Sequence, residues 1–540
     1  MSYSCTQLPL AIGFPFIVSL LLLAVGRWLP DFLGKILAYA GFLLPAVIGI
    51  VAWIRFGEHV NPETGYAYLV TLPFGLKSLG IAMTLGLNGI SMPLFVLAGI
   101  VGAAAGFQAI NNGPDENKPL YFGLLLFILS GLLGVFASVD VFFFYFFHEF
   151  ALIPTFILIL CWGGLGRRTA AIQMAVYLTL GAMISLAGII MLYIKTGSQS
   201  FDLIALKQAV ATAPLDACSQ SMIFGLLLFG FGILVSLFPF HSWAPPAYTE
   251  APTPVSMLHA GVLKKFGLYG LIQLGAMLLP LGLERWAPLL LWLALGNIVI
   301  IGLVTMSQRH LKEMISYSSV MHMGPCFLGI VAYSAYVGGG SAGIGAAVMM
   351  MFAHGLSVAL LFVLCQGVYK RAGTFEFGEI GGLTKNAPVL AGFFIAATMA
   401  SIGLPGFANF WGELGIFVSL GNLPPWQLAL AVSSIVISAI YGLRAVANVF
   451  FGSQSEPLKN HLATHPARDI TISERLASII LLAALVAVGF YPKLITDPLD
   501  KVLKQDFSTT APAALPPDCQ DKPSAPPAAE TTLASNSTHR

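Results

Sequence analysis

The sequence predicts an all-α protein that crosses a membrane about fourteen times. Of its 540 residues, 57% are hydrophobic and 9% are charged, whereas roughly 25% of the residues of a soluble domain are charged. The mean hydropathy is +0.84, and apolar runs of about 20 residues, enough for one helix to cross a bilayer, recur along the chain. No alternation of period two dominates, which argues against a β-barrel. The formal net charge of +2 gives no indication of a nucleic-acid partner.

Short polar loops separate the predicted membrane helices. Lysine and arginine gather in the loops on one side, such as those that hold Arg27, Lys118 and Arg309, so the N-terminus is predicted to face away from the cytoplasm. Residues 201–210 are predicted to form a short surface helix. In chain order the predicted membrane helices span residues 8–29, 32–54, 80–107, 119–138, 140–162, 170–194, 221–243, 255–279, 286–306, 311–334, 343–369, 387–421, 427–452 and 475–492.

Two of the long apolar runs are interrupted by proline and glycine. One contains LFPFHSWAPP (Leu237–Pro246) and the other contains GLPGFANFWGE (Gly403–Glu413). Paired broken helices predict a transporter built from two repeats, with its site near the middle of the membrane; the alternative is that the prolines only kink these helices. The predicted segments are N-terminal helices (1–110), a first repeat (111–280), a second repeat (281–452), a C-terminal loop with the last membrane helix (453–507), and a tail rich in Pro, Ala, Ser and Thr that we expect to be disordered (508–540).

Ionisable side chains occur within several of the predicted membrane helices. An unpaired charge at the bilayer centre costs at least ~2.5–3.5 kcal/mol, so such residues normally face the protein interior and have partners. Burial lowers the pKa of a lysine and a nearby carboxylate raises it, so a change in their separation loads or releases a proton. A series across the chain therefore predicts a proton route, with a structural salt bridge or a packed histidine as the alternative for any one residue. The candidates are Asp140, Glu149, His259, Lys264, Lys265, His322, His354 and Glu413.

Two of these carboxylates lie on one predicted helix. Glu149 is nine residues after Asp140, which corresponds to about 13 Å of helix rise. We therefore expect Asp140 near one membrane surface and Glu149 near the centre. His148 lies about 100° around the helix from Glu149 and need not share its face, so both a proton-transfer role and a packing role are open for it.

The sequence holds no motif for a redox cofactor or a metal. Gly338, Gly340 and Gly343 match the pattern G-x-G-x-x-G, but no predicted strand precedes them and no acidic residue follows at the distance that a dinucleotide site requires. The cysteines form no C-x-x-C pair, so neither a zinc site nor an iron–sulfur site is predicted. We expect no cofactor in this chain.

Five motifs are long enough to compare with known families: HEFALIP (His148–Pro154), FPFHSWAPPAYTEAPTPVS (Phe238–Ser256), LKKFGLYG (Leu263–Gly270), ISYSSVMHMG (Ile315–Gly324) and LPGFANFWGE (Leu404–Glu413). They resemble the antiporter-like subunits of respiratory complex I, of the NuoM or NdhD type (chain 4 in cyanobacteria and chloroplasts). The similarity extends from about residue 80 to about residue 450.

The resemblance implies a fourteen-helix subunit with two inverted five-helix repeats that are antiporter-like. It would translocate protons in the membrane arm of an NAD(P)H- or ferredoxin-linked quinone oxidoreductase, whose iron–sulfur clusters and plastoquinone or other quinone are bound elsewhere in the complex. The implied surroundings are other membrane-arm subunits and the lipids of a cyanobacterial thylakoid membrane. The implied proton pathway consists of Glu149 (channel glutamate), Lys265 (central lysine), His322 and His354 (relay histidines), Glu413 (terminal glutamate) and Asp140 (acidic residue at the end of the glutamate helix).

One departure from the family pattern concerns the partner of Glu149. Leu234 stands where the family usually has a lysine. Lys264, at a position that is generally apolar in the family, is a candidate replacement partner. Together with the unusual His148, this suggests the divergent cyanobacterial form devoted to CO2 uptake, which would have a carbonic-anhydrase-like partner protein. The alternatives are a cation/proton antiporter subunit of a multisubunit exchanger, a membrane subunit of a hydrogenase, and a membrane scaffold.

Overall fold

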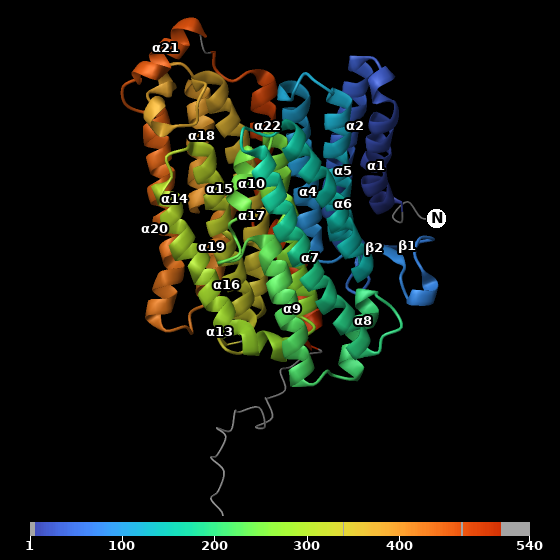
Figure 1. Ribbon diagram of the computed structural model, residues 1–540. Helices are drawn as coiled ribbons and strands as arrows, with labels where there is room; N and C mark the ends of the chain where they lie inside the picture. The colour runs from blue at the N-terminus through green and yellow to red at the C-terminus, as the bar shows by residue number, and fades with distance from the viewer. Residues whose placement is uncertain (1–5, 339, 466–467, 509–540) are drawn as a thin grey trace, which may run out of the picture.

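The protein is a bundle of helices that stand side by side, seen in a computed structural model that describes residues 6–338, 340–465 and 468–508 (Figure 1). Within these residues, eleven helices are long and apolar enough to cross a membrane, or up to twelve if the bent pair at 474–500 is one span. The other predicted crossings are those whose helices are interrupted or bent. The prediction of an all-α polytopic membrane protein is confirmed. The tail beyond residue 508, predicted to be disordered, lies outside the described residues.

The described helices follow the predicted order. Those of the first half are α1 (Gln7–Val25), α2 (Asp31–Ile54), α3 (Phe56–His59), α4 (Ser91–Asn112), α5 (Lys118–Ala137), α6 (Val141–Trp162), α7 (Arg167–Thr196), α8 (Leu203–Thr212), α9 (Ala217–Val235), α10 (Ala244–Glu250), α11 (Thr253–Leu258) and α12 (Lys265–Gly270). Those of the second half are α13 (Pro280–Gly296), α14 (Gly302–Ser307), α15 (Leu311–Met321), α16 (Met323–Tyr333), α17 (Ser341–Ala372), α18 (Pro388–Ile402), α19 (Ala408–Ser419), α20 (Pro425–Phe450), α21 (Glu456–Thr464), α22 (Ile472–Phe490) and α23 (Lys493–Ser508).

The loops between the helices gather at the two ends of the bundle. The basic face is the end at which α21 lies, formed by the loops at 26–30, 113–117, 163–166 and 373–387 (Figure 1). The α8 face is the opposite end, formed by α8 and the loops at 138–140, 277–279 and 420–424 (Figure 1). The predicted surface helix at 201–210 is confirmed as α8, which starts directly after Asp202, whose side chain accepts a hydrogen bond from the backbone N–H of Ile204.

The predicted helix at 80–107 starts later than expected. The residues before it form strand β2 (Met83–Leu87), which pairs antiparallel with β1 (Ala67–Leu72), Leu72 lying opposite Met83. Asn88 explains the later start, because its Oδ1 accepts hydrogen bonds from the backbone N–H groups of Ile90 (3.0 Å) and Ser91 (2.8 Å). Such a side-chain cap satisfies donors that the first turn of a helix leaves free.

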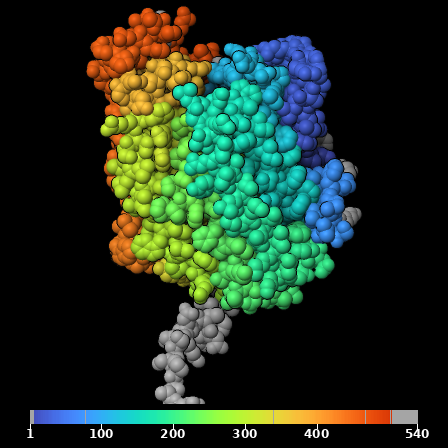
Figure 2. All heavy atoms as spheres, in the orientation of Figure 1, coloured from blue at the N-terminus to red at the C-terminus, as the bar shows by residue number. Residues whose placement is uncertain are grey.

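A buried central set of helices is surrounded by exposed ones. All of the apolar stretch of α17 is buried, as is 94% of the apolar stretch of α4 and of the continuous span 311–333. The corresponding share is 39% for α1, α2, α7 and α20, which therefore cover the outside. Figure 2 shows the helices of residues 7–54 and those of residues 425–464 at opposite sides of the bundle, with the middle of the chain between them.

Both predicted helix interruptions are present, and a third irregularity was not predicted. The first break separates α9 from α10 after Ser236, whose φ of +68° ends the helix. The second separates α18 from α19. The segment from Thr253 to Ala276 also departs from a regular helix, because π-helical turns η4 (His259–Leu263) and η5 (Leu271–Ala276) lie on either side of α12. π-helical turns inside α-helices are frequent at functional sites.

Candidate functional site

All but one of the predicted site residues are buried. Asp140, Lys264, Lys265, His322, His354 and Glu413 are each no more than 3% exposed. Glu149 differs, because its side chain is 33% exposed. The buried charges therefore face the interior of the bundle, as the high cost of exposing charge to lipid requires.

The two neighbouring lysines point to different partners. Lys264 is the residue between η4 and α12, and its Nζ donates hydrogen bonds to the backbone O and the Oγ of Ser319, each at 2.8 Å. The same Nζ lies 5.3 Å from the centre of the Tyr248 ring. The Nζ of Lys265 donates to the backbone O of Ala260 at 2.7 Å. Lys264, rather than Lys265, is thus hydrogen-bonded to the second repeat.

Ser319 joins Lys264 to the predicted relay histidines. The Oγ of Ser319 lies 3.1 Å from Nε2 of His354. The rings of His354 and His322 are stacked with their centres 5.3 Å apart. A lysine ammonium donates hydrogen bonds, whereas hydroxyl and imidazole groups can both donate and accept those that proton transfer uses. The side chains form a polar row, called here the central relay: Lys264, Ser319 and His354, which are joined by hydrogen bonds, and His322, whose ring stacks on that of His354.

Both ring nitrogens of His322 face backbone carbonyl oxygens. Its Nδ1 lies 2.8 Å from the backbone O of Ser318, and its Nε2 lies 3.1 Å from the backbone O of Ser401. A carbonyl oxygen only accepts hydrogen bonds, and an imidazole donates from both nitrogens only when it is protonated. The two carbonyl groups therefore favour a proton on each ring nitrogen, whereas the burial of the ring disfavours its charge.

A hydroxyl pair continues the relay from His322 into a cavity. Ser318 Oγ lies 3.4 Å from Nδ1 of His322 and 2.7 Å from the hydroxyl oxygen of Tyr441. Ser318, Ser401 and Tyr441 line a small cavity between α15, α18 and α20, with room for about one water. Its wall includes Met314, which lies on the basic-face side of Ser318 along α15.

Glu413 sits beside the second helix break. Gly403 has φ of +84°, and a Cβ at this position would lie 2.3 Å from Oε2 of Glu413. Only glycine leaves room for the carboxylate here and adopts this φ easily. Cys326 lies close enough to Lys264, Lys265 and Glu413 to be affected by the charge of each, so the terminal glutamate and the lysines surround one region.

A second polar connection runs between α17 and α19. Asn409 Nδ2 lies 3.3 Å from Oγ of Ser357, and that hydroxyl donates to the backbone O of His354 at 3.3 Å. Asn409 is one helical turn before Glu413. Polar groups of both α17 and α19 therefore lie between His354 and Glu413.

Glu149 lies beside His148, its neighbour in the sequence. Nδ1 of His148 lies 3.5 Å from Oε1 of Glu149, and neither atom has a hydrogen-bond partner among the described residues. The His148 ring stacks on Phe266 with centres 4.0 Å apart. Lys264, the suggested replacement partner, is bonded to Ser319, so that pairing is not present. Leu234 is buried and supplies no charge.

Asp140 lies at the α8 face, apart from the central relay. Its side chain caps α6 by accepting hydrogen bonds from the backbone N–H of Phe142 (2.9 Å) and Phe143 (3.1 Å), and it also accepts one from Ala82 (2.9 Å). Burial and, to a smaller extent, the nearby Asp202 raise the pKa of the Asp140 carboxyl to about 6. Asp140 thus lies at the end of α6, as predicted for it.

The Asn297 side chain forms hydrogen bonds to the first helix break and to α15, the helix that carries Ser319. Its Oδ1 accepts from the backbone N–H of Phe238 (2.7 Å), and its Nδ2 donates to the backbone O of Ser236 (3.1 Å) and of Val320 (2.9 Å). Asn297 is completely buried. One amide therefore satisfies backbone groups at the break and in the helix that carries Ser319.

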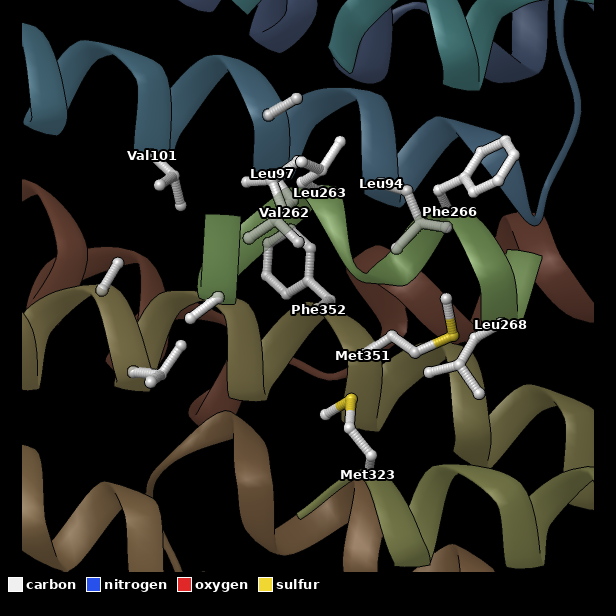
Figure 3. Close-up of a cluster of buried hydrophobic side chains, with 14 of the residues drawn as sticks. Leu94, Leu97, Val101, Val262, Leu263, Phe266, Leu268, Met323, Met351 and Phe352 are labelled. Carbon is white, nitrogen blue, oxygen red and sulfur yellow. The ribbon is translucent and has the colours of Figure 1, made fainter. Parts of the chain in front are cut away.

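Apolar side chains enclose the lysine segment. Gly261 and Gly355 allow η4 and α17 to approach, since a Cβ on Gly355 would lie 2.6 Å from the O of Gly261. Figure 3 shows the apolar groups of this region: Val262, Leu263, Phe266 and Leu268 lie between Leu94, Leu97 and Val101 of α4 and Met323, Met351 and Phe352 of α16 and α17. Across residues 6–338, 340–465 and 468–508, no group of three or more His, Cys, Asp or Glu side chains could hold a metal ion.

Comparison with known families agrees with this arrangement. The family described as "NADH:quinone oxidoreductase/Mrp antiporter, TM" matches residues 138–438, which include both breaks and the whole central relay. The chain belongs to this family.

Relatives from cyanobacteria match most of this chain. The protein named NAD(P)H-quinone oxidoreductase chain 4 1 of Picosynechococcus sp. is 33% identical over 94% of this chain and 92% of its own length. The chain 4 protein of Gloeobacter violaceus is 31% identical over 93% of this chain and 95% of its own length.

Solved structures share the fold of this chain. A chain of respiratory complex I from Thermus thermophilus with bound NADH is 26% identical, with a TM-score of 0.81 over 93% of this chain and 99% of that one. A chain of the Mrp complex from Dietzia sp. matches in fold alone, at 18% identity and a TM-score of 0.80, over 94% of this chain and 98% of that one.

The sequence pointed to the ionisable residues but not to the groups that connect them. Ser319, Ser318, Tyr441, Asn297 and Asn409 were not predicted as site residues. Ser318 and Ser319 lie in the motif ISYSSVMHMG, so two hydroxyls near His322 were a visible signal. Tyr441 and Asn297 carry no local signal, because only the tertiary packing of separate helices brings them to the relay.

Proposed function

We propose that this chain is a proton-translocating membrane-arm subunit of a complex I-like NAD(P)H-quinone oxidoreductase. The observation that carries the proposal is the central relay, in which a buried lysine, a serine and two histidines lie in contact at the middle of the bundle. Electron transfer would take place in other subunits. The similarity to chain 4 relatives over more than nine-tenths of the chain supports the assignment to this class of complex.

The relay would move protons through changes in the distances between charges. Lys264 as ammonium donates to Ser319, whose hydroxyl passes a proton to His354 while accepting one from the lysine. His354 would pass the proton to His322, where two carbonyl groups favour the protonated ring. Moving one charge against 100 mV requires about 2.3 kcal/mol, which is about 1.7 pKa units at 1.36 kcal/mol each. Small displacements of buried charges supply shifts of this size.

The two ends of the route would be Glu149 and Glu413, with Lys265 between them. Lys265 and Glu413 both lie near Cys326, and we propose that a proton passes between them through water. His148 would serve as the partner of Glu149, because Leu234 supplies none. A half-exposed carboxylate on the outer face of α6 would be costly against lipid, so we propose that a neighbouring membrane-arm subunit covers Glu149.

We further propose the location and partners of this subunit. The named relatives are cyanobacterial, which supports a thylakoid membrane, plastoquinone as the electron acceptor of the whole complex, and iron–sulfur clusters in its other subunits. The Glu149–His148 pair, in place of a glutamate–lysine pair, supports a specialised complex. Its additional partner would be a carbonic-anhydrase-like protein for CO2 uptake, and the test is co-purification with the tagged chain.

The proton function is tested in the assembled complex in sealed vesicles, by measuring protons translocated per quinone reduced. We expect Glu413→Gln and Lys265→Met to lower this ratio by at least half while quinone reduction without a proton gradient continues. Glu456→Gln is the matched control, because Glu456 is exposed on α21 and pairs with the exposed Lys459. An unchanged ratio in both variants would refute the proposal. A ratio that depends on Na⁺ or K⁺ would instead favour a cation/proton antiporter.

A further inference from the structure

The last membrane helix, α22, lies directly against the second helix break. Gly489 is the point of contact, because a Cβ at this position would lie 2.1 Å from the backbone O of Gly406 and 2.6 Å from Cα of Phe407. Real Cβ atoms essentially never approach another atom to less than 3.0 Å. The atoms in the way belong to the backbone, so no side-chain rotation makes room for a Cβ. Only glycine at position 489 allows this close approach.

The side chain of Trp411 adds a hydrogen bond to this contact. Trp411 belongs to α19 and lies two residues before Glu413. Its Nε1 donates to the backbone O of Gly489 at 2.7 Å. That carbonyl is among the last four of α22, which ends at Phe490, and the last four carbonyl groups of a helix have no partner within it. The bond therefore satisfies a helix end and joins α22 to the helix that carries Glu413.

Both ends of α22 are attached to α17, the helix that carries His354. At the basic face, Oε2 of Glu474 lies 2.9 Å from Nη2 of Arg371. At the other end the chain bends by 62° into α23. A Cβ on Gly345 of α17 would lie 3.5 Å from Cδ2 of Leu499 in α23, an ordinary contact distance. Because α22 is attached to α17 at two places, it can support the break in a fixed position.

Glu413 depends on this packing for its position. Its side chain is 3% exposed, and its Oε2 has no hydrogen-bond partner among the described residues. The residue before it, Gly412, lies against the backbone of α17, because a Cβ there would lie 2.8 Å from Cα of Met350. The start of α19 therefore has a backbone contact with α17 and, through the break, another with α22. These contacts, rather than a hydrogen bond to Oε2, set the place of the carboxyl group.

We propose that Gly489 and Trp411 are positioning residues, which set the place of the Glu413 carboxyl by holding α22 against the second helix break. The inference rests on the proposed function, because that function gives Glu413 a part in proton transfer. A methyl group at position 489 would push the break away by about 1 Å, the difference between 2.1 Å and the 3.0 Å of the shortest real contacts. A misplacement of about 1 Å at a reacting group can slow a reaction about 100-fold.

Proton translocation by the assembled complex in sealed vesicles is the first measurement. We expect Gly489→Ala to lower the number of protons translocated per quinone reduced by at least half. Gly392→Ala is the matched control, because Gly392 also lies in an apolar helix, α18, and a Cβ there meets no atom within 4 Å. Trp411→Phe keeps an aromatic ring but loses the N–H group, so it should also lower the ratio, and it tests the contact even if Gly489→Ala does not assemble. Its control is Trp292→Phe, a change at a half-exposed tryptophan of α13.

Infrared difference spectroscopy of the complex separates positioning from a loss of stability. The carboxyl band of Glu413 is identified by its absence in Glu413→Gln. We expect Gly489→Ala and Trp411→Phe to shift the frequency of this band, because each moves the carboxyl group relative to its surroundings. A change that only destabilises the fold would lower the melting temperature and leave the frequency where it is. An unchanged frequency in both variants would overturn the inference.

Glu413→Gln distinguishes this inference from the function on which it rests. If Glu413→Gln lowers the translocation ratio while Gly489→Ala and Trp411→Phe behave as their controls, this inference fails and the proposed function stands. If neither Glu413→Gln nor Lys265→Met changes the ratio, the proposed function itself fails, and this inference fails with it.

Discussion

Ser319→Ala is the most informative single change, because Ser319 is the only side chain that contacts both Lys264 and His354 among the hydrogen bonds of the described residues. Its Oγ lies 2.8 Å from Nζ of Lys264 and 3.1 Å from Nε2 of His354. The substitution removes both contacts but leaves the backbone O of residue 319 as an acceptor for the lysine. The relay is thereby interrupted between the lysine and the histidine, while the fold is altered by a single oxygen atom.

The magnitude follows from the kind of hydrogen bond that is lost. A hydrogen bond to a charged group contributes about 1.5–3 kcal/mol, and each 1.36 kcal/mol of activation free energy changes a rate about tenfold. Proton passage along the relay should therefore slow by about 10- to 100-fold. Electron transfer in other subunits loses no contact, so uncoupled quinone reduction should remain within about twofold of the unmodified complex.

The assay is the rate of proton uptake into or release from sealed vesicles that carry the complex, divided by the rate of quinone reduction. Ser316→Ala is the matched control: Ser316 is equally buried on α15, but its Oγ bonds to the backbone O of Lys312 and to Thr249 instead of to the relay. The reasoning is refuted if Ser319→Ala translocates protons at the same ratio as Ser316→Ala.

Three further predictions concern other parts of the structure. Asn297→Leu removes the hydrogen bonds of the amide to the backbone N–H of Phe238 and to the backbone O of Ser236 and Val320, at about 1–3 kcal/mol for each buried group left without a partner. The melting temperature of the complex should therefore fall by far more than in the control Gln273→Leu, whose amide has no described partner; equal melting temperatures would contradict this. Glu474→Gln breaks the buried ion pair with Arg371 (2.9 Å) and the partly exposed one with Lys370 (3.2 Å). Loss of the buried pair should destabilise the docking of α22 by about 3–5 kcal/mol, seen as faster hydrogen exchange in α22 but not in α5. Burial holds the pKa of the Asp140 carboxyl at about 6 instead of 3.8, so the carboxyl should be protonated below pH 6 and ionised above it. Infrared difference spectra of the unmodified complex against Asp140→Asn measure the midpoint of this titration. A midpoint near pH 4 would disprove the effect of burial.

The fold was predictable because apolar runs of membrane length leave few alternatives. Helix breaks were predictable for the same reason, since LFPFHSWAPP and GLPGFANFWGE place Pro and Gly within apolar runs. The start of α4 was not predictable, because it depends on the cap made by Asn88 and on the pairing of β2 with β1. The π-helical turns on either side of α12 also lack a local signal in the sequence.

The candidate site was predictable in its charges and unpredictable in its contacts. A buried lysine or glutamate is conspicuous in an apolar run, so Lys264, Lys265 and Glu413 could be found from the sequence alone. The sequence alone could not show which lysine reaches the second repeat, because adjacent residues point about 100° apart on a helix and the irregular turn at Lys264 alters that direction. The partner of Glu149 was likewise decided by tertiary structure, since Lys264 is held by Ser319.

The central claim is that buried acidic and basic side chains exchange protons along one connected row through the middle of the bundle. The most direct test is a density map of the assembled complex in its membrane, at a resolution that shows ordered water. We expect Lys264 in contact with Ser319, water between Lys265 and Glu413, and a protein neighbour over Glu149. A map in which Lys265 has no water nearby and Glu149 faces lipid would contradict the account.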